Sequence, residues 1–438
     1  MVFGCALGLF IGAMPGLGSV NGVAILLPMT FLVPPTGAII FLAAIYYGAM
    51  YGGAISSIML GIPGASTAVA TTFDGRPLAL AGKADQALIT AAGASFIGGT
   101  VSVILFTLFA PPLAEVALAF GSAEEFALMM LAFATFIGLG GDDIPKTLFS
   151  IFIGLVLSAV GLDIISGEPR LIFGDLPGFF HGIHFLVLAI GIYGIGEMLW
   201  TIESNTDGVK VSQASFGVRR IFAHLKGDPE SFGKGNVEGI AAPESANNSA
   251  STGSMLPMLT LGIPGSPTTA ILLGGMVIWG LEPGPMLFIE HEGFVWGLIA
   301  SLYVANLVAM LINLAFIPAF IAVLRMPFTI LAPIIFVLCL VGGYAPTQNM
   351  HDVWLILIFG VAGYLMRKLD YPLAPAVLAI VLGPLAETSM RQALLMSDGS
   401  LMIFFERPIS GMIMWIAIVL FLLPLIKFYR AKITKNTN

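Results

Sequence analysis

The chain has 438 residues, of which 58% are hydrophobic and only 10% are charged, whereas soluble domains carry about 25% charged residues. Its mean hydropathy is +0.98. This composition excludes an ordinary soluble protein and predicts an all-α polytopic membrane protein. The net charge of −7 comes with no basic patch, so we expect no nucleic-acid partner. Cys5 and Cys339 lie far apart in apolar segments and indicate neither a disulfide nor a metal site.

Apolar segments follow one another along almost the whole chain. Some are shorter than the ~20 residues that a helical span needs, so we expect about 11 to 13 transmembrane helices together with re-entrant or broken pieces. The first segment lacks the basic stretch and the cleavage site of a secretory signal peptide, so we assign it to the membrane region. The expected segments are 2–13, 20–33, 37–60, 64–73, 87–112, 122–140, 144–162, 179–200, 240–261, 266–281, 294–324, 328–345, 351–366, 372–386 and 408–426.

Basic residues gather in two polar stretches, and they predict the orientation of the chain. One stretch contains Lys210, Arg219, Arg220, Lys226 and Lys234, and the other is the C-terminal tail with Lys427, Arg430, Lys432 and Lys435. The positive-inside bias places both in the cytoplasm. We therefore expect an N-terminal transmembrane repeat at 1–200, a cytoplasmic polar linker at 201–236, and a C-terminal transmembrane repeat at 237–438 with a basic cytoplasmic tail.

An internal repeat is the most informative feature of the sequence. The stretch "LGIPGAST" begins at Leu60, and "LGIPGSPT" begins 201 positions later at Leu261. The loop after the first copy, 74–86, contains an arginine and a lysine, whereas the loop after the second copy, 275–292, contains three glutamates and no lysine or arginine. The charge bias places these loops on opposite sides of the membrane. The sequence therefore predicts two inverted repeats, as in many secondary transporters.

Each LGIPG copy predicts a broken helix at membrane depth. Proline removes a backbone donor and glycine permits a turn, after which hydroxyl residues stand where a new helix needs an N-cap. The N-terminus of such a half-helix attracts an anion. Small residues also serve tight helix packing, which is the alternative for a single motif, but two matching copies favour binding. The predicted substrate-binding residues are Pro63, Gly64, Ser66, Thr67, Pro264, Gly265, Thr268 and Thr269.

Two further polar clusters, in "GAMPGLGSVNG" and "APESANNSASTG", supply neutral oxygens suited to a hard cation. We expect a Na⁺ site there, and the scarcity of carboxylates at the centre of the predicted spans favours Na⁺ over H⁺ as the coupling ion. No other cofactor is expected. The predicted cation ligands are Ser19, Asn21, Asn247, Asn248, Ser251 and Thr252.

Other chemistry-bearing patterns do not indicate an enzyme. In "GDDIPKT", Pro145 stands where a phosphate-binding loop needs glycine, and no nucleophile elbow or metalloprotease motif occurs. Asp142 and Asp143 lie beside Lys146, so we expect them to cap a helix and mark topology rather than relay protons. A channel remains an alternative, although inverted repeats and broken helices favour alternating access.

Three stretches carry a family resemblance: "GAMPGLGSVNGVAILLPMTF", "AAIYYGAMYGGAISSIMLGIPGAS" and "PESANNSASTGSMLPMLTLGIPGSPTTAILLGGM". They resemble the signature stretches of the large membrane subunit of tripartite tricarboxylate transporters, and the similarity spans nearly the whole chain. The resemblance implies a multi-pass permease of the bacterial inner membrane. It also implies as partners a small four-helix membrane subunit and a periplasmic substrate-binding protein. Its substrates would be tri- and dicarboxylates, imported with a Na⁺ or H⁺ gradient. A stand-alone ion-coupled carboxylate symporter is the alternative.

Overall fold

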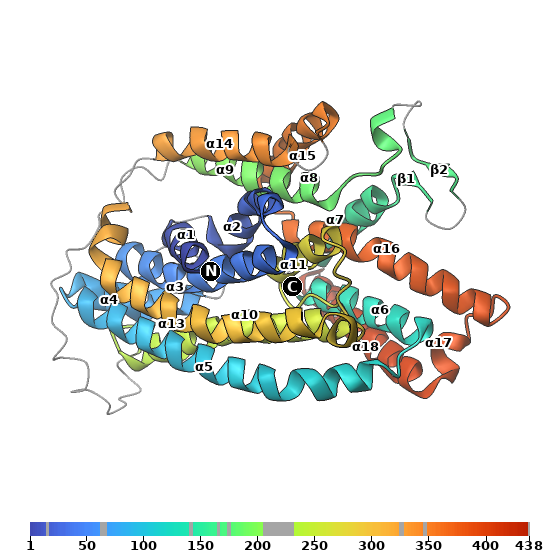
Figure 1. Ribbon diagram of the computed structural model, residues 1–438, viewed down its shortest axis with the longest axis horizontal. Helices are drawn as coiled ribbons and strands as arrows, with labels where there is room; N and C mark the ends of the chain where they lie inside the picture. The colour runs from blue at the N-terminus through green and yellow to red at the C-terminus, as the bar shows by residue number, and fades with distance from the viewer. Residues whose placement is uncertain are drawn as a thin grey trace. The chain divides into compact units, whose positions relative to one another are not determined.

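The computed structural model describes residues 1–14, 17–61, 68–139, 143–163, 167–172, 177–204, 232–323, 328–344 and 348–436. Helices make up nearly all of this part (Figure 1), and its two short strands, β1 (Gly161–Leu162) and β2 (Pro169–Arg170), pair antiparallel. The prediction of an all-α polytopic membrane protein is confirmed.

The helices follow the apolar segments, with differences at the breaks. The α-helices of the first half are α1 (Val2–Ala13), α2 (Gly18–Leu26), α3 (Pro35–Leu60), α4 (Val69–Leu80), α5 (Ala84–Ala117), α6 (Ser122–Leu139), α7 (Ile144–Ser158), α8 (Phe185–Ala189) and α9 (Glu197–Ser204). Two 3₁₀-helices, Leu27–Leu32 and Pro177–Phe179, and a π-helix, Ile190–Gly196, complete this half. The second half contains α10 (Glu238–Leu261), α11 (Pro267–Ile278), α12 (Leu287–Glu290), α13 (Glu292–Val323), α14 (Phe328–Tyr344), α15 (Met350–Lys368), α16 (Leu373–Met396), α17 (Ile403–Glu406) and α18 (Pro408–Asn436).

Six stretches of the described residues are long and apolar enough to cross a bilayer. They are Pro35–Met59, Ala84–Ala117, Phe185–Glu203, Glu292–Ile317, Met350–Lys368 and Leu373–Met396. Six shorter apolar helices of 10–17 residues accompany them. A helix this short crosses a membrane only together with another segment. The number of spans therefore depends on how the short helices combine, and the expected count of about 11 to 13 stays a prediction.

The chain forms two compact units. Unit 1 comprises Met1–Ala114 and Tyr193–Gln348, and unit 2 comprises Glu115–Ile192 and Asn349–Asn438. Each unit thus takes segments from both halves of the sequence. The boundaries predicted at 200 and 237 concern the sequence repeats, which are a different division of the chain, and they stay predictions.

In unit 1, glycines bring α1 and α3 into direct backbone contact. A Cβ atom added at Gly8 would lie 2.3 Å from the carbonyl oxygen of Ile45, and one added at Gly52 would lie 2.3 Å from that of Leu9. Small residues at helical spacing permit this approach, which is a common way for membrane helices to pack. The pairing fixes α3, which carries part of the site described below.

The two LGIPG copies end their helices in the same way. Helix α3 ends at Leu60 and is followed by Gly61 with φ of 72°, whereas α10 ends at Leu261 and is followed by Gly262 with φ of 70°. This left-handed conformation favours glycine. The next helices, α4 and α11, are each 12 residues long. The repeat is therefore visible in the local structure, while its inverted orientation stays a prediction.

Unit 2 packs α16 against α6 and α7, with α18 against α6. A Cβ atom added at Gly154 on α7 would lie 2.2 Å from the carbonyl oxygen of Ala376 on α16. Asp143 is the N-cap of α7, where its carboxylate accepts a hydrogen bond from the Lys146 backbone N–H at 3.4 Å. The capping role predicted for Asp143 is confirmed, and Asp142 lies outside the described residues.

Candidate functional site: a buried polar cluster at the helix breaks

The predicted site residues divide into two groups by what the structure describes. Those of the first LGIPG copy, Pro63, Gly64, Ser66 and Thr67, lie outside the described residues. All the others belong to unit 1. The polar side chains among them are all buried, namely Ser19, Asn21, Asn247, Asn248, Ser251, Thr252, Thr268 and Thr269. Buried polar groups need partners, so their contacts define the site.

At the second LGIPG copy, a capping box at the start of α11 fixes the point where the new helix begins. The hydroxyl of Ser266 accepts from the backbone N–H of Thr269 at 3.2 Å, and the hydroxyl of Thr269 accepts from the backbone N–H of Ser266 at 2.8 Å. Before it, Pro264 is buried, while the backbone N–H of Gly265 donates to the carbonyl of Ser254 at 3.3 Å. This arrangement occupies Thr269 in capping, and the substrate contact expected of it stays a prediction.

The backbone N–H of Thr268, on the same turn, takes no part in the capping box. Pro267 has no N–H, the N–H of Thr269 is capped by Ser266, and the N–H of Ala270 donates to the Ser266 carbonyl at 3.0 Å. Within the described part of the chain, the backbone N–H of Thr268 has no acceptor. A free N–H at the first turn of a helix is a donor for an anion, and the helix dipole reinforces it.

The side chain of Thr268 joins the two predicted sets of residues. Its Oγ1 lies 2.9 Å from Oγ of Ser19, which stands on the first turn of α2. The predicted substrate residue and the predicted cation residue are thus neighbours. The N-terminal ends of α2 and α11 therefore meet at two hydroxyl groups, each close to the positive end of a helix dipole.

Two tyrosines of α3, which the sequence analysis missed, complete this end of the cluster. The hydroxyl of Tyr46 lies 3.2 Å from Oγ of Ser254 and 3.1 Å from Oγ of Ser266, and the hydroxyl of Tyr47 bonds to Thr252. Both rings are buried. The signal was the run "YYGAMY" within an apolar helix, because a buried tyrosine hydroxyl needs a hydrogen-bond partner.

A second group of contacts surrounds Glu244, a residue that the sequence analysis also missed. Its side chain is 0% exposed. Thr71 Oγ1 donates to its Oε1 at 2.5 Å, and Ser95 Oγ donates to its Oε2 at 3.4 Å. Glu244 lies within the apolar segment 240–261, and an ionisable residue inside a predicted span marks a functional site by default. That signal was available in "APESANNSASTG".

The residues predicted to hold Na⁺ divide between these two groups. Asn248 Nδ2 donates to Ser95 Oγ at 2.6 Å, beside Glu244, and Asn247 Nδ2 donates to the Met50 carbonyl at 3.3 Å. Ser251 donates to the Asn248 carbonyl of its own helix at 2.7 Å. Ser19 and Thr252 belong to the first group, and Asn21 is buried in the first turns of α2. Their role as cation ligands stays a prediction. In the described residues, no group of three or more His, Cys, Asp or Glu side chains could hold a metal.

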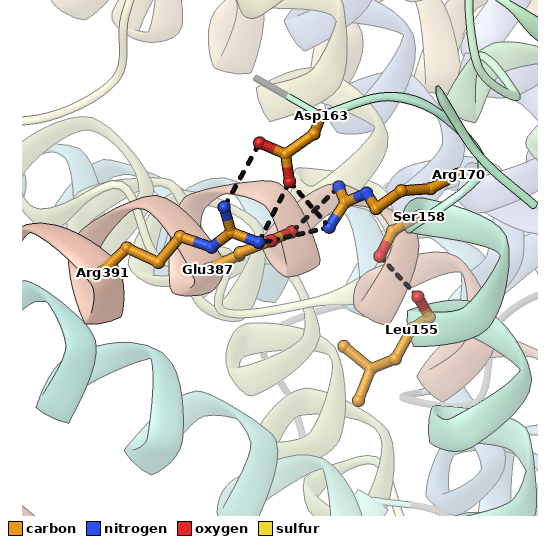
Figure 2. Close-up of polar contacts among 6 residues, drawn as sticks. All are labelled: Leu155, Ser158, Asp163, Arg170, Glu387 and Arg391. Atoms are coloured by element: carbon orange, nitrogen blue, oxygen red, sulfur yellow. Dashed lines mark hydrogen bonds and ion pairs between the residues drawn. The ribbon is translucent and has the colours of Figure 1, made fainter. Parts of the chain in front are cut away.

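Unit 2 contains a different polar group, in which all four members are charged (Figure 2). Asp163 directly follows β1 and Arg170 is the last residue of β2, while Glu387 and Arg391 lie one turn apart on α16. Each arginine contacts both carboxylates, with Arg170 Nη1 at 2.7 Å from Glu387 Oε1 and Arg391 Nη2 at 3.0 Å from Asp163 Oδ2. Hydrogen bonding to Glu387 raises the pKa of Arg170 above its ordinary value. The charges balance, so this cluster fastens the hairpin to α16.

The chain is similar over most of its length to a known protein family. The family model described as "Tripartite tricarboxylate transporter TctA family" matches residues 1–223 and 208–378. The chain is 36% identical to an Agrobacterium vitis protein named "Uncharacterized 52.8 kDa protein in TAR-I ttuC' 3'region", covering 98% of this chain and 94% of that protein. It is also 36% identical to an Agrobacterium vitis "Uncharacterized protein in TAR-II ttuC' 3'region", covering 50% of this chain and 90% of that protein. No solved structure matches the chain.

Proposed function

The chain belongs to the TctA family of tripartite tricarboxylate transporters, and on this premise we propose that it is the permease that imports small tri- or dicarboxylate anions with a cation gradient. The observation that carries the proposal is the meeting of the α2 and α11 N-termini at Ser19 and Thr268. Hydroxyl donors and a free backbone N–H beside two positive dipole ends suit carboxylate oxygens. Because these donors are neutral, they bind an anion less tightly than a basic side chain would, which suits a substrate that must also be released.

The family gives the wider setting of the proposal. Substrate reaches the permease from a periplasmic binding protein, and a small membrane subunit completes the transporter in the bacterial inner membrane. The C-terminal tail, with its four basic residues, lies in the cytoplasm on the positive-inside bias. In this proposal the first LGIPG copy also belongs to the substrate site through Ser66 and Thr67, which lie outside the described residues.

Cation coupling follows from the charge of the substrate. Moving each negative charge inward against a negative-inside potential costs about 2.3 kcal/mol per 100 mV. A di- or trianion therefore accumulates only when cations enter with it. Na⁺ is the coupling ion in this proposal.

Uptake into proteoliposomes tests the proposal. The purified permease with its small membrane subunit is reconstituted, and radiolabelled citrate, succinate and malate are offered under imposed Na⁺ or proton gradients, with and without the periplasmic binding protein. We expect uptake of at least one acid that requires the Na⁺ gradient and the binding protein. Uptake without the binding protein would favour a stand-alone symporter, and no carboxylate uptake under any gradient would refute the proposal.

Paired substitutions at one position test the site. Thr268→Val removes the hydroxyl that contacts Ser19 while keeping the shape of the side chain, and Thr268→Ser keeps the hydroxyl. We expect Thr268→Val to abolish uptake without loss of folded protein, and Thr268→Ser to retain it. Equal uptake by both variants would remove Thr268 from the substrate site.

A further inference from the structure

Glu244 has an unusual environment for a carboxylate. It lies on α10 with no exposed surface, and every side chain that contacts it in the described part of the chain is neutral: Thr71, Ser95 and Asn247. Burying a charge without a compensating partner costs several kcal/mol. Among the described residues no basic side chain forms an ion pair with the Glu244 carboxylate, so a cation bound beside its ionised form would supply the compensating charge.

The neighbouring oxygens point to the same conclusion. Asn248 is 0% exposed, and its Oδ1 has no hydrogen-bond partner. The amide of the same side chain lies 2.6 Å from Ser95 Oγ, which lies 3.4 Å from Glu244 Oε2. An unpaired buried oxygen is rare and costly. These neighbouring side chains carry carboxylate, hydroxyl and amide oxygens, which are the ligand types that a hard cation takes.

We propose that Glu244, Asn248, Ser95 and Thr71 form a Na⁺ site, distinct from the Ser19–Thr268 contact. A single carboxylate matches a monovalent ion, whereas Ca²⁺ sites use several charged oxygen ligands. The absence of histidine and cysteine from these four residues disfavours a transition metal. This site would bind the coupling ion of the proposed function. Only the role of the bound ion in transport rests on the proposed function.

The position of the site links the cation to both helix breaks. Thr71 lies on the first turn of α4, directly after the first LGIPG copy, and Ser95 lies on α5. Glu244 and Asn248 lie on α10, which ends at the second copy. A hydrogen bond outside the site also joins α5 to α10: Ser102 Oγ donates to the Ser249 carbonyl at 2.9 Å. A bound ion would draw α4 and α5 onto α10, so cation occupancy and the geometry of the two breaks would depend on each other.

Ion-dependent stability of the full chain tests this site without any substrate. The purified protein in nanodiscs is heated in NaCl, KCl or choline chloride at equal ionic strength. Since a ligand that binds only the folded state stabilises it in a saturable manner, we expect the midpoint temperature to rise with Na⁺ and to saturate. Glu244→Gln should raise the half-saturating Na⁺ concentration at least about tenfold, as loss of a ligand-shell group does. The matched control is Glu238→Gln on the first turn of the same helix, which should respond as the wild type does.

Further variants keep the test decisive if Glu244→Gln does not fold. Ser95→Ala and Thr71→Val each remove one hydroxyl from the site, and both should weaken the Na⁺ response. Equal effects of Na⁺, K⁺ and choline on the wild-type protein would overturn the proposal, as would an unchanged Na⁺ response in the Glu244, Ser95 and Thr71 variants. A Na⁺ response that depends on Glu244 in a protein that transports no carboxylate would support the site and refute the proposed substrate.

Discussion

The two units of this protein each join distant segments through a polar cluster, and the two clusters use opposite chemistry. In unit 1, hydroxyls from α2, α3, α10 and α11 meet at positions that are mostly buried. In unit 2, two arginines and two acids meet where Arg170 is 28% exposed and Arg391 is 35% exposed. The guanidinium groups of unit 2 are thus partly hydrated, whereas most of the hydroxyls of unit 1 are buried. Glu244 is a buried carboxylate of unit 1 whose described hydrogen-bond partners are neutral, and it is the one for which we propose a cation.

The difference in chemistry between the two clusters also predicts different effects of mutation on stability and on transport. A neutral hydrogen bond contributes only about 0.5–1.5 kcal/mol to stability, because on folding it replaces hydrogen bonds that the same groups made with water. Such contacts are readily exchanged for those of a ligand. A four-member ion cluster is harder to replace, since removing one member leaves the others uncompensated. We therefore expect unit 2 variants to lose stability and unit 1 variants to lose transport.

The largest effect on stability is expected from Asp163→Ala in unit 2. Asp163 is 5% exposed and contacts both Arg170 and Arg391. Its removal should lower the free energy of unfolding by about 3 kcal/mol, the lower end for a broken buried pair because the arginines remain partly hydrated. Denaturant unfolding in detergent measures it. Asp163→Asn should lose less, and the KM for uptake should not change in either variant. A changed KM would contradict the division between the clusters.

A smaller effect is expected from Ser266→Ala in unit 1. This change removes the N-cap of α11 and one partner of Tyr46. We expect a loss of about 1 to 2 kcal/mol in the free energy of unfolding, as for other N-caps. Uptake should fall further than this stability loss explains, because α11 presents Thr268. Ser266→Thr keeps a capping hydroxyl and serves as the control; if uptake falls equally in both variants, the cap is not the cause.

Two tyrosines of unit 1 give a matched pair of hydroxyl deletions. Tyr46→Phe removes a hydroxyl with two partners, Ser254 and Ser266. Tyr193→Phe removes a buried hydroxyl that has no partner in the described part of the chain. Tyr46→Phe should cost about 1 kcal/mol, whereas Tyr193→Phe should be neutral or stabilising. Thermal unfolding of both variants checks this, and equal losses would show that ring burial rather than hydrogen bonding decides the effect.

The smallest effect is expected from salt. KCl at 1 M screens partly exposed charges far more than buried ones, so it should reduce the stability difference between wild type and Asp163→Ala by a few tenths of a kcal/mol. The difference between wild type and Tyr46→Phe should stay the same. KCl rather than NaCl is required, because Na⁺ acts on the proposed site in unit 1.

The sequence predicted local features better than it predicted contacts. The helix ends at Gly61 and Gly262 and the cap at Asp143 follow from residues within one turn, so periodicity and turn chemistry identify them. The partners of Tyr46 and Glu244 lie on other helices, and no local pattern names them. The six predicted cation ligands share a chemical type, yet packing distributes them between two groups. Residue type thus predicted which side chains are polar and buried, whereas helix packing determines which of them contact one another.

The glycine contact between α1 and α3 has a consequence for genetics. Gly48 and Gly52 face the backbone of α1, while Tyr46 and Tyr47 of the same helix reach the polar cluster. A side chain at either glycine would push α3 aside, and the displacement would reach those two hydroxyls through a rigid helix. Mutations that impair transport should therefore map to α1 as well, at positions that touch no polar residue. Second-site suppressors should then be sought on the opposing helix face rather than at the site.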